Sequence, residues 1–407
     1  MSTLASSLEV LREKPFRHFF IGRSISKLGS SLTPLALTFG ILGLEGTGAD
    51  VGFVLGAGLL PQLLLLLFGG VVGDRFERRL ILVGSDVVMG GAQAVSAFLL
   101  VTGRAEIIHL AALQFLVGAA DAFFNPASSG AIRDFVGASR VQEARSLLGI
   151  SGSSIRIVGP AIAGVIIAIS NAGIALALDA ASFFVSAWIL SRVRVGFTPL
   201  EFKNSIKSDL IEGWKEVASR SWIWGYILFA CVFQATALPV LQILGPLIAR
   251  DSLGGASGWA FLLSAQSAGT FISGFILLKW KPKFPMRAAV TLCLFTLPFI
   301  VVLAIPNVQL AWLLLPAIVW GATLPMGDNL WFVALAAHVP DQAQSRVSSY
   351  DWLGSLALAP AGFWLMGHLA SALPASQILL TVAAINLVCG LLLFGLRGIR
   401  QLERLQS

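Results

Sequence analysis

The sequence predicts an all-α membrane protein with twelve transmembrane helices in two pseudo-symmetric bundles of six. Three observations predict this class. Of the 407 residues, 56% are hydrophobic and only 12% are charged, and the mean hydropathy of +0.84 lies well above that of a soluble domain. Apolar stretches long enough to cross a bilayer recur between breaks of charge, proline or glycine. One long polar segment divides the chain at its centre.

Each predicted spanning segment has roughly the 20 apolar residues that a helix needs to cross the hydrocarbon core. The first six run over 17–44, 50–72, 80–102, 106–132, 144–170 and 172–192. The last six run over 222–249, 256–278, 286–305, 308–337, 345–371 and 374–396. We therefore expect an N-terminal bundle over 1–192, a cytoplasmic linker over 193–221 and a C-terminal bundle over 222–407.

The linker combines charges with an apolar pattern near helical spacing. Its apolar members are Leu210, Ile211, Trp214 and Val217. This pattern predicts an amphipathic helix at the cytoplasmic surface of the membrane, with a connecting role favoured over a regulatory one.

The distribution of Lys and Arg predicts the orientation. If the N-terminus is cytoplasmic, 23 of the 28 basic residues fall in cytoplasmic segments and two, Arg104 and Arg250, fall outside. The other three lie within predicted spans: Arg23, Lys27 and Arg156. Because cytoplasmic loops are enriched in basic residues, both termini are expected in the cytoplasm. The net charge of +7 then reflects topology, and the scattering of basic residues over short loops argues against a nucleic-acid partner.

Cofactor, metal and nucleotide sites are not expected. The three cysteines lie in apolar stretches without C-x-x-C spacing, as buried free thiols do. No Walker A sequence is present, so the energy for transport would come from an ion gradient. The first apolar segment lacks a usual cleavage site and is expected to remain as the first helix.

A weak internal repeat supports two related halves. The stretch from Phe135 to Ala161 corresponds to the stretch from His338 to Ala361, so that Pro160 and Pro360 hold equivalent places. Such similarity is expected if a six-helix bundle has been duplicated.

A dense run of charge between the second and third apolar stretches predicts a tight cytoplasmic turn, because these charges cannot lie in hydrocarbon. The run matches the signature G-x-x-x-D-R-x-G-R-[RK] at Gly70, Asp74, Arg75, Arg78 and Arg79. In these residues the chain resembles the major facilitator superfamily. Glu77 replaces the usual glycine, which puts the turn geometry in question. An acidic residue here is similar to the exporter subgroup that includes macrolide-efflux proteins and the enterobactin exporter, as are residues 123–127, 156–164 and 180–184.

The resemblance implies a cytoplasmic gate at this turn. In the family, its acidic and basic residues bridge the two halves and hold the cytoplasmic side shut. Asp74 would meet the N-terminal end of a helix of the other half, and Arg78 would pair with Asp134. Alternatively, the arginines only set the orientation and bind anionic lipid headgroups. The corresponding loop of the second half, 274–283, keeps only basic residues, so the gate is expected to be asymmetric.

The fifth segment contains Gly159, Pro160 and Gly164, which resemble a motif associated with antiporters in this superfamily. The glycines permit close helix approach, and the proline frees a carbonyl and kinks the helix. The resemblance favours antiport; without it, a packing role would be the better interpretation.

Ionisable groups at membrane depth are costly and are functional candidates. Asp121 shares a helix face with Gln114, and the resemblance places this helix beside a central cavity, so Asp121 is a candidate to carry the coupled proton. Alternatively, Asp121 forms an internal pair with Arg156 or another basic residue, and the partner of Arg156 would be Asp121 or Asp179. Asp328 is a further proton-coupling candidate.

Other intramembrane charges have simpler interpretations. Asp86 and Asp351 lie near predicted cytoplasmic ends and are expected to cap helices or belong to the gate. Arg23 and Lys27 share a helix face and either extend toward the interface or attract an anionic substrate.

The expected substrate cavity combines aromatic and amide side chains, as suits a bulky amphipathic compound. The alternative for each residue is packing against lipid or another helix. The candidates are Arg23, Gln114, Tyr226, Phe233, Gln234 and Trp331.

These observations predict a secondary active transporter of the inner or plasma membrane. Its expected function is proton-coupled export, by alternating access, of an organic compound such as a drug or siderophore. Expected partners are this small molecule, protons and membrane lipids, and the chain is expected to be a monomer. The alternative is an importer or facilitator of a small metabolite. A membrane enzyme is disfavoured, because the four histidines lie in separate segments.

Overall fold

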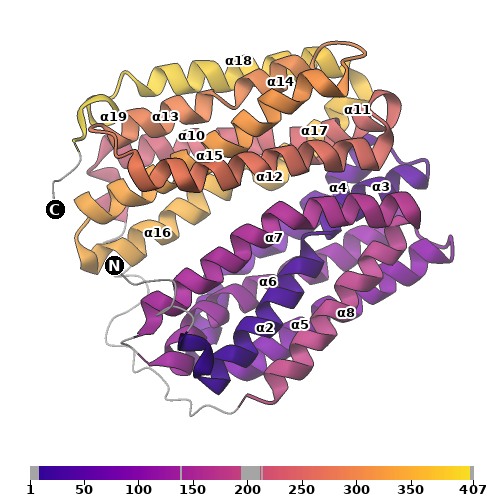
Figure 1. The fold of residues 1–407 in the computed structure, drawn as a ribbon, viewed down its shortest axis with the longest axis horizontal. Coiled ribbons are helices and arrows are strands. Elements are labelled where there is room, and N and C mark those ends of the chain that lie inside the picture. The colour runs from indigo at the N-terminus through magenta and orange to yellow at the C-terminus, as the bar shows by residue number, and fades with distance from the viewer. Residues whose placement is uncertain (1–8, 138–139, 194–210, 212–213, 404–407) are drawn as a thin grey trace. The chain divides into compact units, whose positions relative to one another are not determined.

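The computed structural model describes residues 9–137, 140–193, 211 and 214–403 (Figure 1). Within its helices, the side chains of residues 66–75, 157, 278, 341–342 and 345–346 lie outside the described part. Every regular element of the described residues is a helix. Twelve of the described helical segments are long and apolar enough to cross a membrane, which confirms the predicted fold class.

The chain divides into two compact units, unit 1 (Met1–Glu201) and unit 2 (Phe202–Ser407). Each contains six of the twelve candidate spans. The elements of unit 1 are the short turn η1 (Val10–Arg12), α2 (Lys14–Ser30), α3 (Thr33–Gly43), α4 (Gly48–Arg75), α5 (Arg78–Val101), α6 (Ile107–Val136), α7 (Val141–Ile169) and α8 (Ala172–Ser191). In this unit α4 packs along α6, and α5 packs along α8, while α2 contacts α7 and α8.

The first span of unit 1 is interrupted between α2 and α3. Pro34 lies in the first turn of α3, where it needs no backbone donor, and proline disfavours a helical conformation at the residue before it. The break at Ser31 and Leu32 therefore exposes polar groups in the middle of a span. Two of these groups recur in the candidate site.

Unit 2 is interrupted more often. Its elements are α10 (Ser221–Pro239), the π-helical turn η3 (Val240–Leu244), α11 (Gly245–Ser252), α12 (Gly255–Lys279), α13 (Pro285–Leu294), α14 (Leu297–Leu303), α15 (Leu310–His338), α16 (Asp341–Leu356), α17 (Ala359–Ala372), α18 (Ala375–Leu393) and α19 (Arg397–Gln401). Three spans are thus composite: α10 with η3 and α11, α13 with α14, and α16 with α17. A proline lies at or next to each of these interruptions.

The two prolines at equivalent places in the repeat have different effects. Pro160 lies inside α7, which continues to Ile169. Pro360 lies in the first turn of α17, directly after the interruption that follows Leu356. Proline has no backbone N–H group. The first turn of a helix does not need this donor, whereas inside a helix its loss removes one backbone hydrogen bond and kinks the helix.

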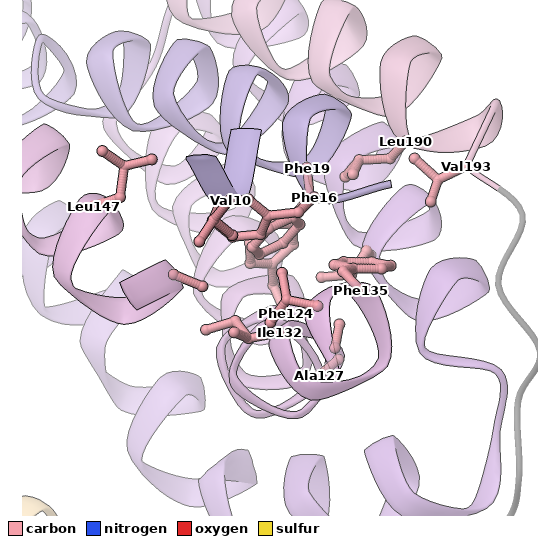
Figure 2. Close-up of a cluster of buried hydrophobic side chains, with 14 of the residues drawn as sticks. Val10, Phe16, Phe19, Phe124, Ala127, Ile132, Phe135, Leu147, Leu190 and Val193 are labelled. Carbon is pink, nitrogen blue, oxygen red and sulfur yellow. The ribbon is translucent and has the colours of Figure 1, made fainter. Parts of the chain in front are cut away.

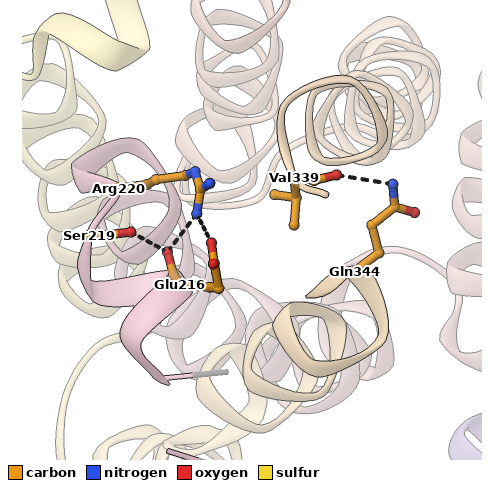
Figure 3. A network of polar contacts seen from close by, with 5 residues as sticks. All are labelled: Glu216, Ser219, Arg220, Val339 and Gln344. Carbon is orange, nitrogen blue, oxygen red and sulfur yellow. Dashed lines mark hydrogen bonds and ion pairs between the residues drawn. The ribbon is translucent and has the colours of Figure 1, made fainter. Parts of the chain in front are cut away.

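The predicted amphipathic linker helix is only partly described, and Leu210 lies outside the described residues. Residues 214–218 are helical; Val217 is buried and Trp214 is exposed, with its ring 5.8 Å from that of Tyr350 in α16. Polar contacts continue this segment into α10. Arg220 pairs with Glu216, and Ser219 donates a hydrogen bond to the Glu216 carbonyl (Figure 3). Nearby, at the start of α16, Gln344 donates a hydrogen bond to the carbonyl of Val339.

A cluster of buried phenylalanines joins α2 to α6 in unit 1 (Figure 2). Phe19 of α2 and Phe135 of α6 lie 5.1 Å apart between ring centroids, and Phe16 and Phe124 are fully buried beside them. In a membrane such packing stabilises helix contacts by close van der Waals contact, because lipid is as apolar as the side chains.

Glycines bring helices into backbone contact at matching places of the two units. A Cβ atom on Gly118 of α6 would overlap the carbonyl of Gly58 in α4. In unit 2, a Cβ atom on Gly321 of α15 would overlap the carbonyl of Gln266 in α12. Both contacts join the second and fourth spans of their unit, and both depend on the absence of a side chain.

Gly118→Ala should therefore destabilise the protein, because the added methyl group must separate α6 from α4. We expect the free energy of unfolding in mixed micelles, followed by circular dichroism, to fall by about 1–3 kcal/mol. Gly91→Ala in α5 is the matched control, since its Cβ would meet open space and alanine favours a helix. Equal stabilities of the two variants would contradict the contact.

Candidate functional site

Asp121 is the centre of a hydrogen-bonded group in the middle of unit 1. Its Oδ2 accepts a hydrogen bond from Gln62 Nε2 of α4 at 2.6 Å and one from Asn125 Nδ2 of α6 at 2.8 Å. Arg23 of α2 donates from Nη2 to Asn125 Oδ1 at 2.9 Å, so three helices are joined. We call Arg23, Gln62, Asp121 and Asn125 the Asp121 network.

Arg23 supplies the positive charge of the Asp121 network. Its guanidinium carbon lies 4.5 Å from the centre of the Phe124 ring, a cation–π contact that holds the side chain against α6. The charges of Asp121 and Asp86 both act on this guanidinium. Arg23 thus experiences the charges of half-buried Asp121 and fully buried Asp86, at a depth where each isolated charge is costly.

The hydrogen bonds that engage Asp121 and Asp179 come from residues other than Arg156. Arg156 lies on an exposed face of α7, where its Nη2 is 3.5 Å from Ser153 Oγ. Asp121 is directed to α2 and α4 instead, and the carboxylate of Asp179 is engaged by neutral donors. The basic residue connected to Asp121 is Arg23, which donates a hydrogen bond to Asn125, and Asn125 in turn donates one to Asp121.

Asp179 of α8 forms a second buried group with the broken first span. Thr33 Oγ1, at the start of α3, donates to its Oδ2 at 2.6 Å, and Gln93 Nε2 of α5 donates to the same oxygen at 3.0 Å. Gln114 of α6 donates to Gln93 Oε1 at 3.2 Å. Gln114, a predicted cavity residue, is therefore bonded inside unit 1, where it connects α6 to α5.

Asp86 neither caps α5 nor lies at its end. It is fully buried inside this helix, and among the described residues neither carboxylate oxygen has a hydrogen-bond partner. Ser186 of α8 is nearby but does not reach hydrogen-bonding geometry. The position was misjudged because the helix begins at Arg78, so Asp86 lies two turns inside the helix.

The charged turn is partly described. Arg78 Nη1 donates to Asp134 Oδ2 at 2.7 Å and to the Gly130 carbonyl at 3.3 Å, so the expected ion pair joins α5 to α6. Arg79 donates to the carbonyl of Ser191 at the end of α8. The side chains of the other three predicted gate residues lie outside the described part: Gly70, Asp74 and Arg75.

The Gly-Pro element of α7 lies against the break in the first span. A Cβ atom on Gly159 would overlap the Ser31 hydroxyl, so the glycine admits α2 to close contact. Pro160 cannot donate a hydrogen bond to the carbonyl of Arg156, four residues earlier. Gly164 is buried one turn further along.

In unit 2, Asp351 occupies an internal position and does not cap a helix. It is buried inside α16, where Trp331 Nε1 of α15 donates to its Oδ2 at 2.9 Å and Ser355 Oγ donates to its Oδ1 at 3.2 Å. Gln234 Nε2 of α10 donates to the Ser355 carbonyl at 3.2 Å. Asp351 therefore ties α15 to α16, and the expectation of a cap or gate charge is corrected.

The predicted aromatic residues of unit 2 pack together. Tyr226 of α10 stacks on Trp331 with centroids 4.5 Å apart, and Phe233 contacts Trp320 at 6.1 Å. All four rings are buried. Asp328 lies on α15 three residues before Trp331, with an exposed side chain. Trp331 and Tyr226 thus belong to one buried assembly, which half-buried Gln234 joins through Ser355. Asp328 lies less than one turn before Trp331, and its charge acts on Tyr226.

The described residues contain no group of three His, Cys, Asp or Glu side chains that could hold a metal ion.

Sequence reasoning missed several partners. Gln62, Thr33 and Gln93 engage the two carboxylates of unit 1, although each was visible as a lone polar residue in an apolar stretch. Such residues at membrane depth seek polar partners, which is a usable signal. Their pairing could not be predicted, because the partners lie in different helices.

Comparison of the whole chain with known proteins identifies a family and several similar transporters. A family model described as transmembrane secretion effector matches residues 5–407. BacE of Bacillus subtilis strain 168, named as a proposed bacilysin exporter, is 25% identical over 291 residues, which cover 69% of this chain and 70% of BacE. The multidrug efflux pump Tap of Mycobacterium tuberculosis strain CDC 1551 / Oshkosh is 23% identical over 390 residues, covering 92% and 91%.

Solved structures support the fold. The peptide transporter POT in complex with sulfate superimposes with a TM-score of 0.73 at 15% identity, covering 96% of both chains. The nucleoside transporter NupG gives a TM-score of 0.71 at 12% identity, covering 95% of this chain and 99% of NupG.

Arg78 and Asp134 should be energetically coupled, because their side chains are only 13% and 28% exposed and form a charge-assisted hydrogen bond. A double-mutant cycle with Arg78→Ala and Asp134→Ala, measured as free energies of unfolding, should give roughly 0.5–3 kcal/mol of coupling. Arg79 and Glu77 are the control pair, at 4.0 Å with 32% and 36% exposure, and should add almost independently. Similar coupling in both cycles would count against a special role for Arg78.

Proposed function

The chain belongs to the transmembrane secretion effector family of the major facilitator superfamily, and on this premise we propose that it exports an organic compound in exchange for protons. It is a multi-pass membrane transporter and not an enzyme. We propose in addition the direction of transport, which is export, and the coupling ion, which is the proton. The mechanism is alternating access, in which the binding site opens to one side of the membrane at a time.

The Asp121 network is the observation that supports proton coupling. Asp121 lies 14 residues from the start of α6 and 15 from its end, which is about 21 Å along the helix from either side. A carboxylate at this depth is retained at a cost and is a functional candidate. Its neighbours are a base and two amides, which can respond to a change in its charge.

A proton on Asp121 would change the bonds of three helices at once. The ionised carboxylate attracts Arg23 and accepts from Gln62 and Asn125. A neutral carboxyl group no longer attracts the guanidinium and donates through its own hydrogen. Asn125 would then be free to turn, and Arg23 of α2 would be released from α6. Protonation is thereby linked to a rearrangement between α2 and α6.

The broken first span is a suitable place for this rearrangement. Discontinuous helices near the middle of a membrane form the binding sites of many transporters. Here the break after α2 contacts both the second carboxylate, through Thr33 and Asp179, and the Gly-Pro element, through Ser31 and Gly159. Asp179 is retained as an alternative carrier of the proton, and Asp328 is retained as a candidate in unit 2.

Export is supported by the relatives. Tap is named as a multidrug efflux pump, and BacE is named for the export of bacilysin. We propose that this chain acts in the plasma or inner membrane as a monomer surrounded by lipid, with both termini in the cytoplasm. Its substrate would be a bulky amphipathic compound. An importer or facilitator of the same fold is the alternative, because the fold alone does not set direction.

The charged turn would serve as the cytoplasmic gate. Arg78 and Asp134 fix the start of α5 on α6, and Arg79 fixes it to α8. We propose that the turn before this fixed helix start, with Gly70, Asp74 and Arg75, forms contacts that open and close during transport. Binding of anionic lipid by the same arginines is the alternative role.

Asp121→Asn should abolish coupling, since an amide cannot take up a proton in the physiological range. In proteoliposomes containing a pH-sensitive dye, we expect compound-dependent proton movement to fall at least tenfold, measured with a panel of amphipathic drugs. Asp50→Asn is the control, because the Asp50 carboxylate only accepts hydrogen bonds from Thr47 at an exposed helix start. This variant should leave compound-dependent proton movement unchanged. Normal proton movement in Asp121→Asn would reject this assignment.

Direction is tested separately in cells. Expression should lower the retention of each transported compound, and collapse of the proton gradient should restore it. If expression raised the retention of every compound that the protein transports, export would be rejected in favour of import.

A further inference from the structure

Three basic side chains gather near the middle of the membrane on α2 and α7 of unit 1. Arg23 and Lys27 are one turn apart on α2, and Arg156 lies on α7. The charges of Arg23 and Arg156 both act on the ammonium group of Lys27. We call these three residues the basic cluster.

Close packing of the two helices brings the basic cluster together. Ser24 Oγ of α2 lies 2.7 Å from Ser151 Oγ of α7, so the helix faces meet directly beside Lys27. The ammonium lies over Gly152, where a Cβ atom would be only 2.8 Å from Nζ. Arg156 follows Gly152 by one turn on the same face. Gly152 therefore leaves the space that Lys27 occupies.

Depth separates the basic cluster from the membrane surface. Lys27 is 13 residues from the start of α2, and Arg156 is 15 from the start of α7, which places them about 20 and 22 Å along their helices. Basic residues near helix ends reach the lipid headgroups by extending their side chains. These two lie too deep in their spans for that explanation.

The charge of Lys27 is not balanced by a direct contact within the described part of the chain. Arg23 has Asn125, the Phe124 ring and the nearby carboxylates. Lys27, by contrast, has neither a hydrogen bond nor an ion pair among the described residues, and the charged groups that act on it are two further cations. Like charges held together at membrane depth are costly unless an anion joins them.

We propose that Lys27 and Arg156, with Arg23 behind them, bind a carboxylate group of the transported compound. The inference rests on the proposed function, since it concerns the substrate of the same transporter, and it names that substrate as an amphipathic organic acid. Lysine supplies a compact charge and arginine a planar pair of donors, a combination that matches the two oxygens of a carboxylate. The substrate anion would balance the charge of Lys27, which has no direct partner among the described residues.

The test is equilibrium binding of a matched pair of probes, pyrenebutyric acid and its methyl ester. The two differ in charge and share the bulky apolar ring. Purified protein in phosphatidylcholine nanodiscs would be titrated with each probe, followed by energy transfer from tryptophan and corrected with empty nanodiscs. We expect the wild-type protein to bind the acid more tightly than the ester.

Lys27→Gln should weaken binding of the acid at least tenfold and leave binding of the ester unchanged, and Arg156→Gln should act in the same way. Lys27→Arg, which keeps the charge, should retain most of the affinity. Lys14→Gln, at the exposed start of the same helix, is the matched control and should change neither probe. Equal wild-type affinity for acid and ester, or equal weakening of both in Lys27→Gln, would overturn the proposal.

A second arm separates the substrate from lipid. Replacing part of the phosphatidylcholine by phosphatidylglycerol should not displace the acid, and displacement would show that the basic cluster takes an anionic headgroup instead. Because binding is measured without a gradient, the result does not depend on proton coupling. Acid binding with no proton movement would reject the proposed coupling alone, and the reverse would reject this inference alone.

Discussion

The absence of water in the hydrocarbon core is the constraint on which the rest of this structure depends. Every backbone donor and acceptor there must be satisfied inside the protein, so the described spans are helices, and each break in a span is a place where polar groups must find other partners. The break between α2 and α3 illustrates the consequence. Thr33 reaches Asp179, and Ser31 lies against Gly159, so the interruption becomes a centre of contact between helices. The same constraint explains why Asp121 and Asp179 of unit 1 accept hydrogen bonds from amide and hydroxyl groups.

The spans could be predicted from the sequence because hydropathy and length are local properties. A stretch such as 107–136 is apolar whatever surrounds it, and the lipid alone decides its conformation. The site could be predicted only as a set of residue types. Asp121 was identifiable by the cost of its charge, but its partner Gln62 is 59 residues away and Arg23 reaches Asn125 over 102 residues. The pairs of helices that contact one another are determined by packing. Packing depends on residues such as Gly118, which permits close contact because it has no side chain. Asp86 and Asp351 were misplaced for a related reason, since their helices begin earlier than the apolar pattern alone indicates.

The two units keep the same packing while their polar groups differ. Gly118 in unit 1 and Gly321 in unit 2 hold the second and fourth spans together in the same manner. Around them, unit 1 contains the Asp121 network and the basic cluster, whereas unit 2 contains a stack of aromatic rings with one carboxylate, Asp351, held by an indole. Among the described residues, unit 1 thus combines its carboxylates with bases and amides, whereas the assembly of unit 2 is built mainly from buried aromatic rings.

The glycine contact between α4 and α6 has a mechanical consequence for the carboxylate beside it. Gly58 lies one turn before Gln62 on α4, and Gly118 lies three residues before Asp121 on α6. The backbones are thus locked together within a turn of the hydrogen bond from Gln62 to Asp121. This lock prevents the two helices from sliding, so a change at Asp121 cannot be absorbed along their contact. Under the proposed coupling, we expect the change to act instead through Arg23 and the interrupted first span.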